Sequence, residues 1–214
     1  MIMPSYRNGG MERLMEGKQR MEPQEGMERV KEDNLQEQVV LVDMNDQKIG
    51  CMEKMRAHEE GRLHRAFSVF LYKDDAILLQ QRAKEKYHCG GLWTNTCCSH
   101  PRMGESVYQA ACRRLQEELG IKTTDLEEIQ SFVYRYTFEN GLTEFEFDHV
   151  LAGEYRGTWT ENPEEVEAVR WVKMKDLMSD IQENPEHYTP WFMIALKEVM
   201  EYVNKKLQAG KDSI

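Results

Sequence analysis

The side chains with the most evident capacity for chemistry lie in the segment WTNTCCSHPRMGES, residues 93–106, where two cysteines are adjacent and a histidine follows. Cys98 and His100 are two residues apart, so in an extended chain they share one face while Cys97 takes the other. A thiolate can accept a proton, and an imidazole can bind a metal. The same alternation makes Cys97 and Cys98 poor disulfide partners.

A second group of candidate residues lies in the acidic segment TEFEFDH, residues 143–149. On a strand, Glu144, Glu146 and Asp148 share one face, and we expect Phe145 and Phe147 on the other face to point into the core. Two carboxylates with this spacing can hold one divalent ion, or act as ligand and as acid or base. The alternative is an ordinary solvated sheet face.

Histidines offer further metal ligands. His58 and His64 are six residues apart across a predicted turn, and His100 follows the thiol. Each one alone is typical of a surface or satisfied core histidine. Three histidines with two carboxylates would suit zinc or manganese better than a site for magnesium only. The chain has six histidines in all: His58, His64, His88, His100, His149 and His187.

The segment from residue 105 to 121 resembles the Nudix box, G-x5-E-x7-R-E-U-x-E-E-x-G-U, where U is aliphatic. Ser99 stands at the first glycine, and Arg114 replaces the first helical glutamate. The helical glutamates of Nudix hydrolases hold the magnesium ions that activate pyrophosphate cleavage, so Arg114 predicts weakened hydrolysis with diphosphate binding retained. The alternative is a salt-bridged helix surface. The matching residues are Glu105, Arg113, Leu115, Glu117, Glu118, Gly120 and Ile121.

Cations flank this segment although the chain is acidic overall. The formal net charge of -10 argues against a nucleic-acid or anionic-membrane partner, but not against an anionic small molecule in a locally basic pocket. The clustering suits a phosphate-rich ligand, while some of these side chains are expected to be merely solvated. The cations are Lys54, Arg82, Lys84, Lys86, Arg102 and Arg114.

Strands in clusters, with one or two helices between them, predict an α+β fold in which a mixed sheet lies between helices. Ser106 and Gly120 suit the ends of one helix, and Asn140-Gly141 predicts a hairpin. Thr189 and Pro190 suit the start of a C-terminal amphipathic helix with a buried stripe of Phe192, Ala195, Leu196, Val199 and Val203. Strands are predicted at 39–43, 65–72, 76–82, about 129–138, 144–152 and 168–172, and helices at 53–61, 105–120, 173–181 and 189–208.

The expected layout is a disordered extension at 1–36, a single Nudix-like domain at 37–208 and a tail at 209–214. The extension lacks sustained periodicity, and a short amphipathic helix around Met11 to Met15 is the alternative. No apolar run reaches the roughly 20 residues that span a bilayer, and the first residues lack the apolar core of a secretory signal. An odd count of five cysteines without a signal peptide indicates reduced thiols and a cytoplasmic protein, which we expect to be a monomer, and the lack of a CxxC pair argues against a structural zinc site.

With these residues in place, the chain resembles the type I isopentenyl-diphosphate isomerases, which have a modified Nudix fold. The resemblance covers about residues 37–195. A Cys-x-His-Pro before an altered Nudix box, followed by Glu-x-Glu, is not typical of Nudix hydrolases. The segments that carry the resemblance are RAHEEGRLHRAF, GLWTNTCCSHPRMGES, RRLQEELGI, TEFEF and TPWFM.

The resemblance implies a role for each matching residue. Cys98 and Glu146 would be the catalytic pair on opposite sides of the substrate, with Tyr134 assisting Glu146. Glu118 would bind a Mg²⁺ ion that also contacts the substrate diphosphate, and Trp191 would lie near the cationic carbon. A cage for Mn²⁺ or Zn²⁺ would comprise His58, His64, His100, Glu144 and Glu146, and the diphosphate would contact Lys54, Arg82, Lys86 and Arg114.

The implied reaction converts isopentenyl diphosphate into dimethylallyl diphosphate through a tertiary carbocation. One group must deliver a proton to the terminal methylene and another must remove one from C2. Glu146 with Tyr134 is the expected donor and Cys98 the expected acceptor, its pKa lowered by basic neighbours and a bound cation. A Nudix-type diphosphate hydrolase is the alternative, and a non-catalytic binding relative is a third reading. Arg114 and the Cys98–Glu146 pair favour the isomerase.

Overall fold

Strand β3 (His64–Lys73) organises the sheet, because it pairs with four other strands. It runs parallel to β8 (Thr143–Glu154) and antiparallel to β1 (Gln38–Val42), β4 (Ala76–Arg82) and β6 (Cys97–Ser99). Both faces of β3 are buried, which explains its almost continuous apolar sequence.

The remaining strands extend this arrangement into one curled mixed sheet. This computed structural model describes residues 38–86, 88–123 and 125–211, and the predicted extension at 1–36 lies outside them. Within the described residues, nine strands are connected by pairing. Strand β2 (Lys48–Glu53) pairs with β1, β5 (Trp93–Thr94) and β9 (Val166–Lys173) pair with β4, and β7 (Glu127–Thr137) forms a hairpin with β8.

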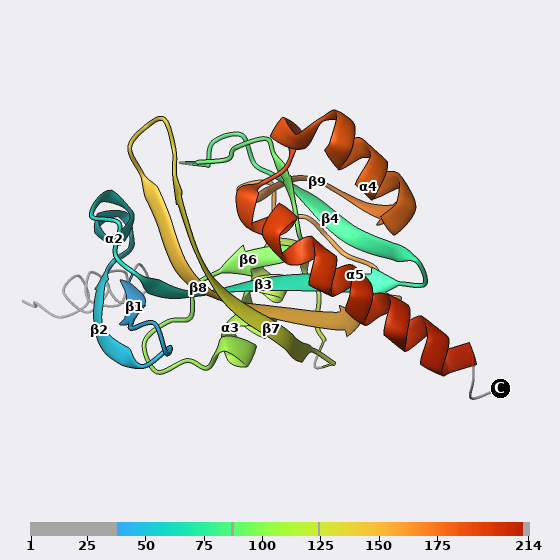
Figure 1. Cartoon of the computed structure of the whole chain (residues 1–214), viewed down its shortest axis with the longest axis horizontal. Helices are drawn as coiled ribbons and strands as arrows, with labels where there is room; N and C mark the ends of the chain where they lie inside the picture. Colours follow the sequence, from blue (N-terminus) through green and yellow to red (C-terminus); the bar gives the residue numbers. More distant parts are fainter. Residues whose placement is uncertain (1–37, 87, 124, 212–214) are drawn as a thin grey trace, which may run out of the picture.

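Helices cover both faces of the sheet (Figure 1). Helix α5 (Pro190–Lys211) crosses one face with α4 (Met174–Glu183) beside it, while α3 (Val107–Leu119) lies behind the sheet. Helix α2 (Lys54–Glu59) packs near β1, and the short 3₁₀ helix η1 (Pro185–His187) precedes α5. Helix α5 continues to Lys211, so it includes the first residues of the tail predicted at 209–214. The predicted α+β class and C-terminal helix are confirmed.

Two apolar layers form the core, one on each face of the sheet. Alternation along β3 sends Phe70 toward α5 and Val69 toward α3. The predicted stripe of α5 is buried and packs in the first layer, as expected for an amphipathic helix on a sheet. The second layer includes Leu115, Leu119 and Ile121 from α3 and the residues after it.

Both predicted ends of α3 are confirmed by its hydrogen bonds. The Ser106 hydroxyl accepts from the Gln109 N–H, and the Ser106 N–H donates to the Gln109 side chain, which completes a capping box. Gly120 is left-handed at φ 64°, and the N–H of Ile121 reaches back to the carbonyl of Leu115 at 3.1 Å. Local sequence therefore fixes the length of the helix that carries the Nudix-like residues.

The predicted faces of β8 are wrong. Glu144, Glu146 and Asp148 are buried, while Phe145 and Phe147 are only half-buried. The alternation itself was predicted correctly, but the carboxylates occupy the inner face because histidine, tyrosine and serine side chains meet them there. Strands β2, β5 and β6 were also not predicted. Strands β5 and β6 are very short, with two and three residues, and β2 is exposed along much of its length.

No helix within the described residues is long and apolar enough to cross a membrane. All five cysteines carry free thiols, as the sequence predicted, and Cys97 is fully buried while Cys51 is exposed.

Gly153 provides a test of the packing around β8. It pairs with Leu71 of β3, and a Cβ at this position would lie 2.3 Å from the Asp125 carbonyl oxygen. We expect Gly153→Ala to lower the free energy of unfolding by about 1–3 kcal/mol, because backbone must shift to relieve the clash. Urea denaturation measures this change. The control, Gly210→Ala, adds its methyl group in open space on α5 and should cause no loss; equal stability of both variants would contradict the packing.

Candidate functional site

Five potential metal ligands from separate segments converge in one buried cluster. One ligand atom from each of His58, His64, His100, Glu144 and Glu146 lies within 4.8 Å of all the others. His58 is on α2, His64 begins β3, His100 follows β6, and both glutamates are on β8. The parallel pairing of β3 with β8 sets His64 directly opposite Glu146. The structure thus brings together the five residues that the sequence assigned to a metal cage.

Backbone carbonyls orient two of these imidazoles. The Nδ1 atom of His58 lies 2.6 Å from the Lys54 carbonyl oxygen, and that of His64 lies 2.8 Å from the Arg62 carbonyl oxygen. A carbonyl can only accept a hydrogen bond, so Nδ1 carries the proton and a neutral ring presents a bare Nε2 to the cluster. A histidine held in this way is in the tautomer that binds a metal.

The two carboxylates are ionised although they are buried. Burial opposes ionisation, but the imidazoles of His58 and His88 beside the carboxylate outweigh it and hold the pKa of Glu144 well below its ordinary value. Burial and the charge of Glu144 also oppose ionisation of Glu146, yet His100 and His64 lower its pKa. Burial lowers the pKa of His100 to about 4, which keeps that ring neutral at physiological pH.

This donor set fits a divalent transition metal. The Nε2 atoms of His64 and His100 are 3.2 Å apart, and His58 Nε2 is 3.1 Å from a Glu144 oxygen. These are all potential ligand atoms that lie close together, and a cation at their centre would satisfy them together. Imidazole nitrogen with carboxylate oxygen suits zinc or manganese.

The two adjacent cysteines lie in different environments. Cys97 is fully buried among apolar residues on the α3 face, whereas Cys98 lines the pocket beside the cluster. The alternation predicted from the sequence is therefore observed on β6. Arg82 Nη1 approaches the Cys98 sulfur at 3.8 Å.

Basic neighbours alone do not lower the pKa of Cys98 in this pocket. Burial raises the pKa of the thiol to about 12, and the charge of Arg82 opposes this only in part. Cys98 is therefore protonated at neutral pH. Desolvation is the largest cause, and the negative charges of Glu118 and Glu146 raise the pKa further.

Tyr134 and Trp191 complete the pocket next to the cluster. The Tyr134 hydroxyl donates to Glu146 at 2.6 Å, and burial raises the pKa of that hydroxyl well above its ordinary value. The Trp191 indole donates to the Thr94 hydroxyl at 3.1 Å, which fixes the ring at the start of α5. Thr189, predicted as the cap of this helix, also meets the Thr94 hydroxyl, at 2.8 Å.

Cations and carboxylates alternate at one end of the pocket. Arg114 pairs with Glu118 at 2.6 Å, and Gln80 donates to the other oxygen of Glu118 at 3.1 Å. Burial lowers the pKa of Lys86 to about 8. The predicted substrate and magnesium residues that line this pocket are Lys54, Arg82, Lys86, Arg114, Glu118 and Trp191.

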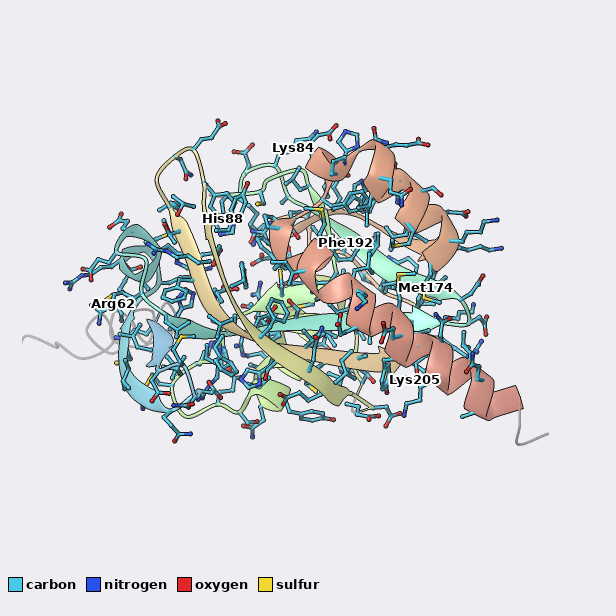
Figure 2. All side chains as sticks on the ribbon, in the orientation of Figure 1. Arg62, Lys84, His88, Met174, Phe192 and Lys205 are labelled. Carbon is cyan, nitrogen blue, oxygen red and sulfur yellow. The ribbon has the colours of Figure 1, made fainter. Side chains whose placement is uncertain are left out.

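Other cations named from the sequence lie elsewhere, and one acid was missed. Lys84 is 72% exposed, pairs with Glu167 and lies at the outer edge of the molecule (Figure 2). Arg102 lines a neighbouring groove. Glu165, which lines the pocket and pairs with both Lys86 and Arg114, follows no motif in the sequence. Only folding reveals it, because Lys86 is 79 residues away along the chain.

Comparison with known proteins gives a consistent assignment. The NUDIX domain family matches residues 62–192. An isopentenyl-diphosphate Delta-isomerase of Photobacterium profundum is 48% identical over 183 residues, covering 82% of this chain and 98% of the relative. Isopentenyl-diphosphate Delta-isomerase 2 of Aromatoleum aromaticum is 46% identical over 167 residues, covering 78% of this chain and 88% of the relative.

Solved structures share the fold at much lower identity. A Deinococcus radiodurans protein superposes with a TM-score of 0.62 at 19% identity, covering 78% of this chain and 99% of that chain. A MutT protein from Methanosarcina mazei gives a TM-score of 0.52 at 14% identity, covering 67% of this chain and 94% of that chain. These likenesses support the architecture alone.

The cluster makes a prediction about metal content. We expect the wild-type protein to bind about one Mn²⁺ or Zn²⁺ ion per chain, and His64→Asn to lose most of it, because the cage loses an oriented ligand. Metal analysis after dialysis measures the stoichiometry. Saturating metal should also raise the melting temperature of the wild type, since it binds only the folded state.

His187→Asn is the matched control, because His187 is exposed and lies outside the cluster. It should bind metal like the wild type. Full metal content in His64→Asn would rule out the cage.

Proposed function

The chain belongs to the Nudix family and, within it, to the isopentenyl-diphosphate Delta-isomerases, and on this premise we propose that the pocket beside the histidine cluster is where it isomerises isopentenyl diphosphate to dimethylallyl diphosphate. One observation carries the assignment of the pocket. A thiol and a tyrosine-bonded carboxylate line it together, with cations at its end.

Cys98 and Glu146 are the proposed catalytic pair. Cys98 is on β6 and Glu146 on β8, and these strands pair with β3 independently. Both side chains line the same pocket, so a substrate between them would meet a proton-exchanging group from each strand. Isomerisation of an unactivated double bond needs both groups, one to give a proton and the other to take one.

The reactive form of the site is proposed to carry a proton on Glu146 and a thiolate at Cys98, which differs from the ionised carboxylate and protonated thiol described above by transfer of one proton. From this form, Glu146 with Tyr134 delivers a proton to the terminal methylene. The electrons of the double bond form the new C–H bond and leave a tertiary carbocation. Cys98, as thiolate, then removes a proton from C2, and the C–H electrons become the new double bond. One proton enters and one leaves, so no oxidant or reductant is required.

The raised pKa of Cys98 suits a reversible proton exchange. Burial makes its thiolate a strong base in the forward direction. The thiol, which is the form that burial favours, can return the proton to C2 in the back reaction. The face of Trp191, which lines the pocket, would stabilise the cation by about 1–2 kcal/mol once water is excluded.

Two metal roles are proposed. Mn²⁺ or Zn²⁺ in the cage of His58, His64, His100, Glu144 and Glu146 would fix the Glu146 carboxylate and add positive charge beside it, while Mg²⁺ at Glu118 would neutralise the diphosphate. Lys54, Arg82, Lys86 and Arg114 would bind the diphosphate oxygens.

Diphosphate hydrolysis is disfavoured as the main activity. Arg114 occupies the position of a magnesium-binding glutamate in the Nudix box, and its guanidinium pairs with Glu118. The substitution removes one of the helical metal ligands that a hydrolase uses, and the guanidinium attracts a diphosphate.

We also propose the setting in which the enzyme works. The acidic net charge of -10 and the free thiols support a cytoplasmic monomer acting on a small diphosphate without a nucleic-acid or membrane partner. Residues 37–208 would form the one catalytic domain.

The adjacent thiols allow a matched test of catalysis. Cys98→Ala is expected to lower kcat by about 10²–10⁴-fold, because one proton-exchanging group is lost. Cys97→Ala should retain measurable turnover, since Cys97 faces the core. NMR in heavy water would follow formation of dimethylallyl diphosphate with incorporated deuterium. Equal losses in both variants would refute the assignment of the thiol, and a wild type without turnover at any metal would refute the activity.

Two lysines of one loop test the diphosphate site. Lys86→Met should raise the KM for isopentenyl diphosphate by about 10–100-fold, because it removes a charge-assisted contact. Lys84→Met should leave KM unchanged, since Lys84 is exposed and outside the pocket. Steady-state kinetics measure both. An unchanged KM in Lys86→Met would remove Lys86 from the site.

A further inference from the structure

In each of the two buried glutamates, Glu144 and Glu146, one carboxylate oxygen faces the cluster and the other contacts a side chain outside it. In Glu146, Oε1 lies 2.8 Å from His100 Nε2 and faces the cluster. Its Oε2 atom instead accepts a hydrogen bond from the Tyr134 hydroxyl at 2.6 Å. One oxygen is thereby held by a donor outside the cluster, and the other is presented to a metal.

Glu144 shows the same division with a different donor. Its Oε2 atom faces His58 Nε2 at 3.1 Å, and because the proton of His58 is on Nδ1 a neutral His58 meets this oxygen with a lone pair. Its Oε1 atom contacts Nε2 of His88. The two atoms lie within ion-pair distance but do not meet the geometry of a hydrogen bond. A carboxylate oxygen can only accept, so a proton on Nε2 of His88 is the arrangement that would let His88 act as a donor to Glu144, while His58 faces the other oxygen.

Three neighbours hold His88 in this position. Its ring stacks on Phe138 at 4.8 Å with an interplanar angle of 12°, and the edge contact with Trp191 is 5.9 Å between ring centroids. Its carbonyl oxygen accepts from Arg82 Nη2 at 3.3 Å. Figure 2 shows His88 between the β7–β8 hairpin and the start of α5. The side chain is buried, so this arrangement is built into the fold.

His88 is outside the group of five ligand atoms that lie within 4.8 Å of one another. Its ring centroid is 6.0 Å from that of His58. Its Nε2 atom is occupied by Glu144, on the oxygen that points away from His58. These positions suit a residue that acts on the metal through Glu144.

We propose that His88 is a positioning residue for the metal centre: its Nε2–H holds Oε1 of Glu144, so that Oε2 is aimed at the metal, as Tyr134 does for Glu146. Outer hydrogen bonds of this kind orient a ligand carboxylate and strengthen metal binding. Because His88 stacks on Phe138, the orientation of the Glu144 carboxylate would depend on the position of the hairpin tip. The inference rests on the proposed metal centre.

The test compares metal affinities without substrate. His88→Phe keeps a flat ring against Phe138 but has no donor, and His88→Gln keeps an N–H donor. Titration of metal-free protein with Mn²⁺ against a chromophoric chelator measures the dissociation constant. We expect His88→Phe to bind Mn²⁺ about 10–100-fold more weakly than the wild type, and His88→Gln to recover most of that loss. Melting temperatures of the metal-free proteins should be similar, which a purely structural role would not predict.

Each outcome decides the proposal. Wild-type affinity in His88→Phe would overturn it, and so would a His88→Gln as weak as His88→Phe. If His88→Phe does not fold, His88→Met against His88→Gln gives the same comparison, because the two side chains have similar length and only glutamine donates. Failure of the wild type to bind Mn²⁺ or Zn²⁺ would instead refute the metal centre itself, which distinguishes the two ideas.

Discussion

The burial of two carboxylates on one strand is the constraint on which the rest of the site depends. Glu144 and Glu146 are 3% and 7% exposed. Each would cost several kcal/mol of desolvation if it were left unpaired. The compensation comes from α2, from the start of β3, from the residue after β6 and from the loop after β4. These segments must meet at β8, so the electrostatic requirement of two side chains shapes a large part of the domain.

Strand β3 brings the proposed catalytic pair to one pocket. Its pairing with β6 brings Cys98 to the pocket, and its pairing with β8 brings Glu146. The strict alternation of β6 then decides that Cys98 faces the pocket while Cys97 joins the core. The two groups proposed to exchange protons are thus placed by backbone pairing, which is more rigid than placement by loops.

Local signals made much of the fold predictable. Ser106 and Gly120 mark the ends of α3, and the hairpin turns at Gly141 with φ 87°. Which face of β8 is inside was not predictable, because phenylalanine is normally the buried residue and the reversal depends on distant partners. The resemblance named the residues now found around the pocket. It gave no hint of His88 or Glu165, whose contacts join segments far apart in the chain and have no local spacing.

The parallel register of β3 and β8 has a consequence for how the protein matures. His64 lies opposite Glu146, so a slip of one residue would turn both glutamates to the outer face and bring Phe145 and Phe147 inward. Such a chain could bury apolar rings well and still lack the cage. A bound metal ion would therefore select the correct strand alignment, because it would stabilise only the register in which the glutamates and histidines meet.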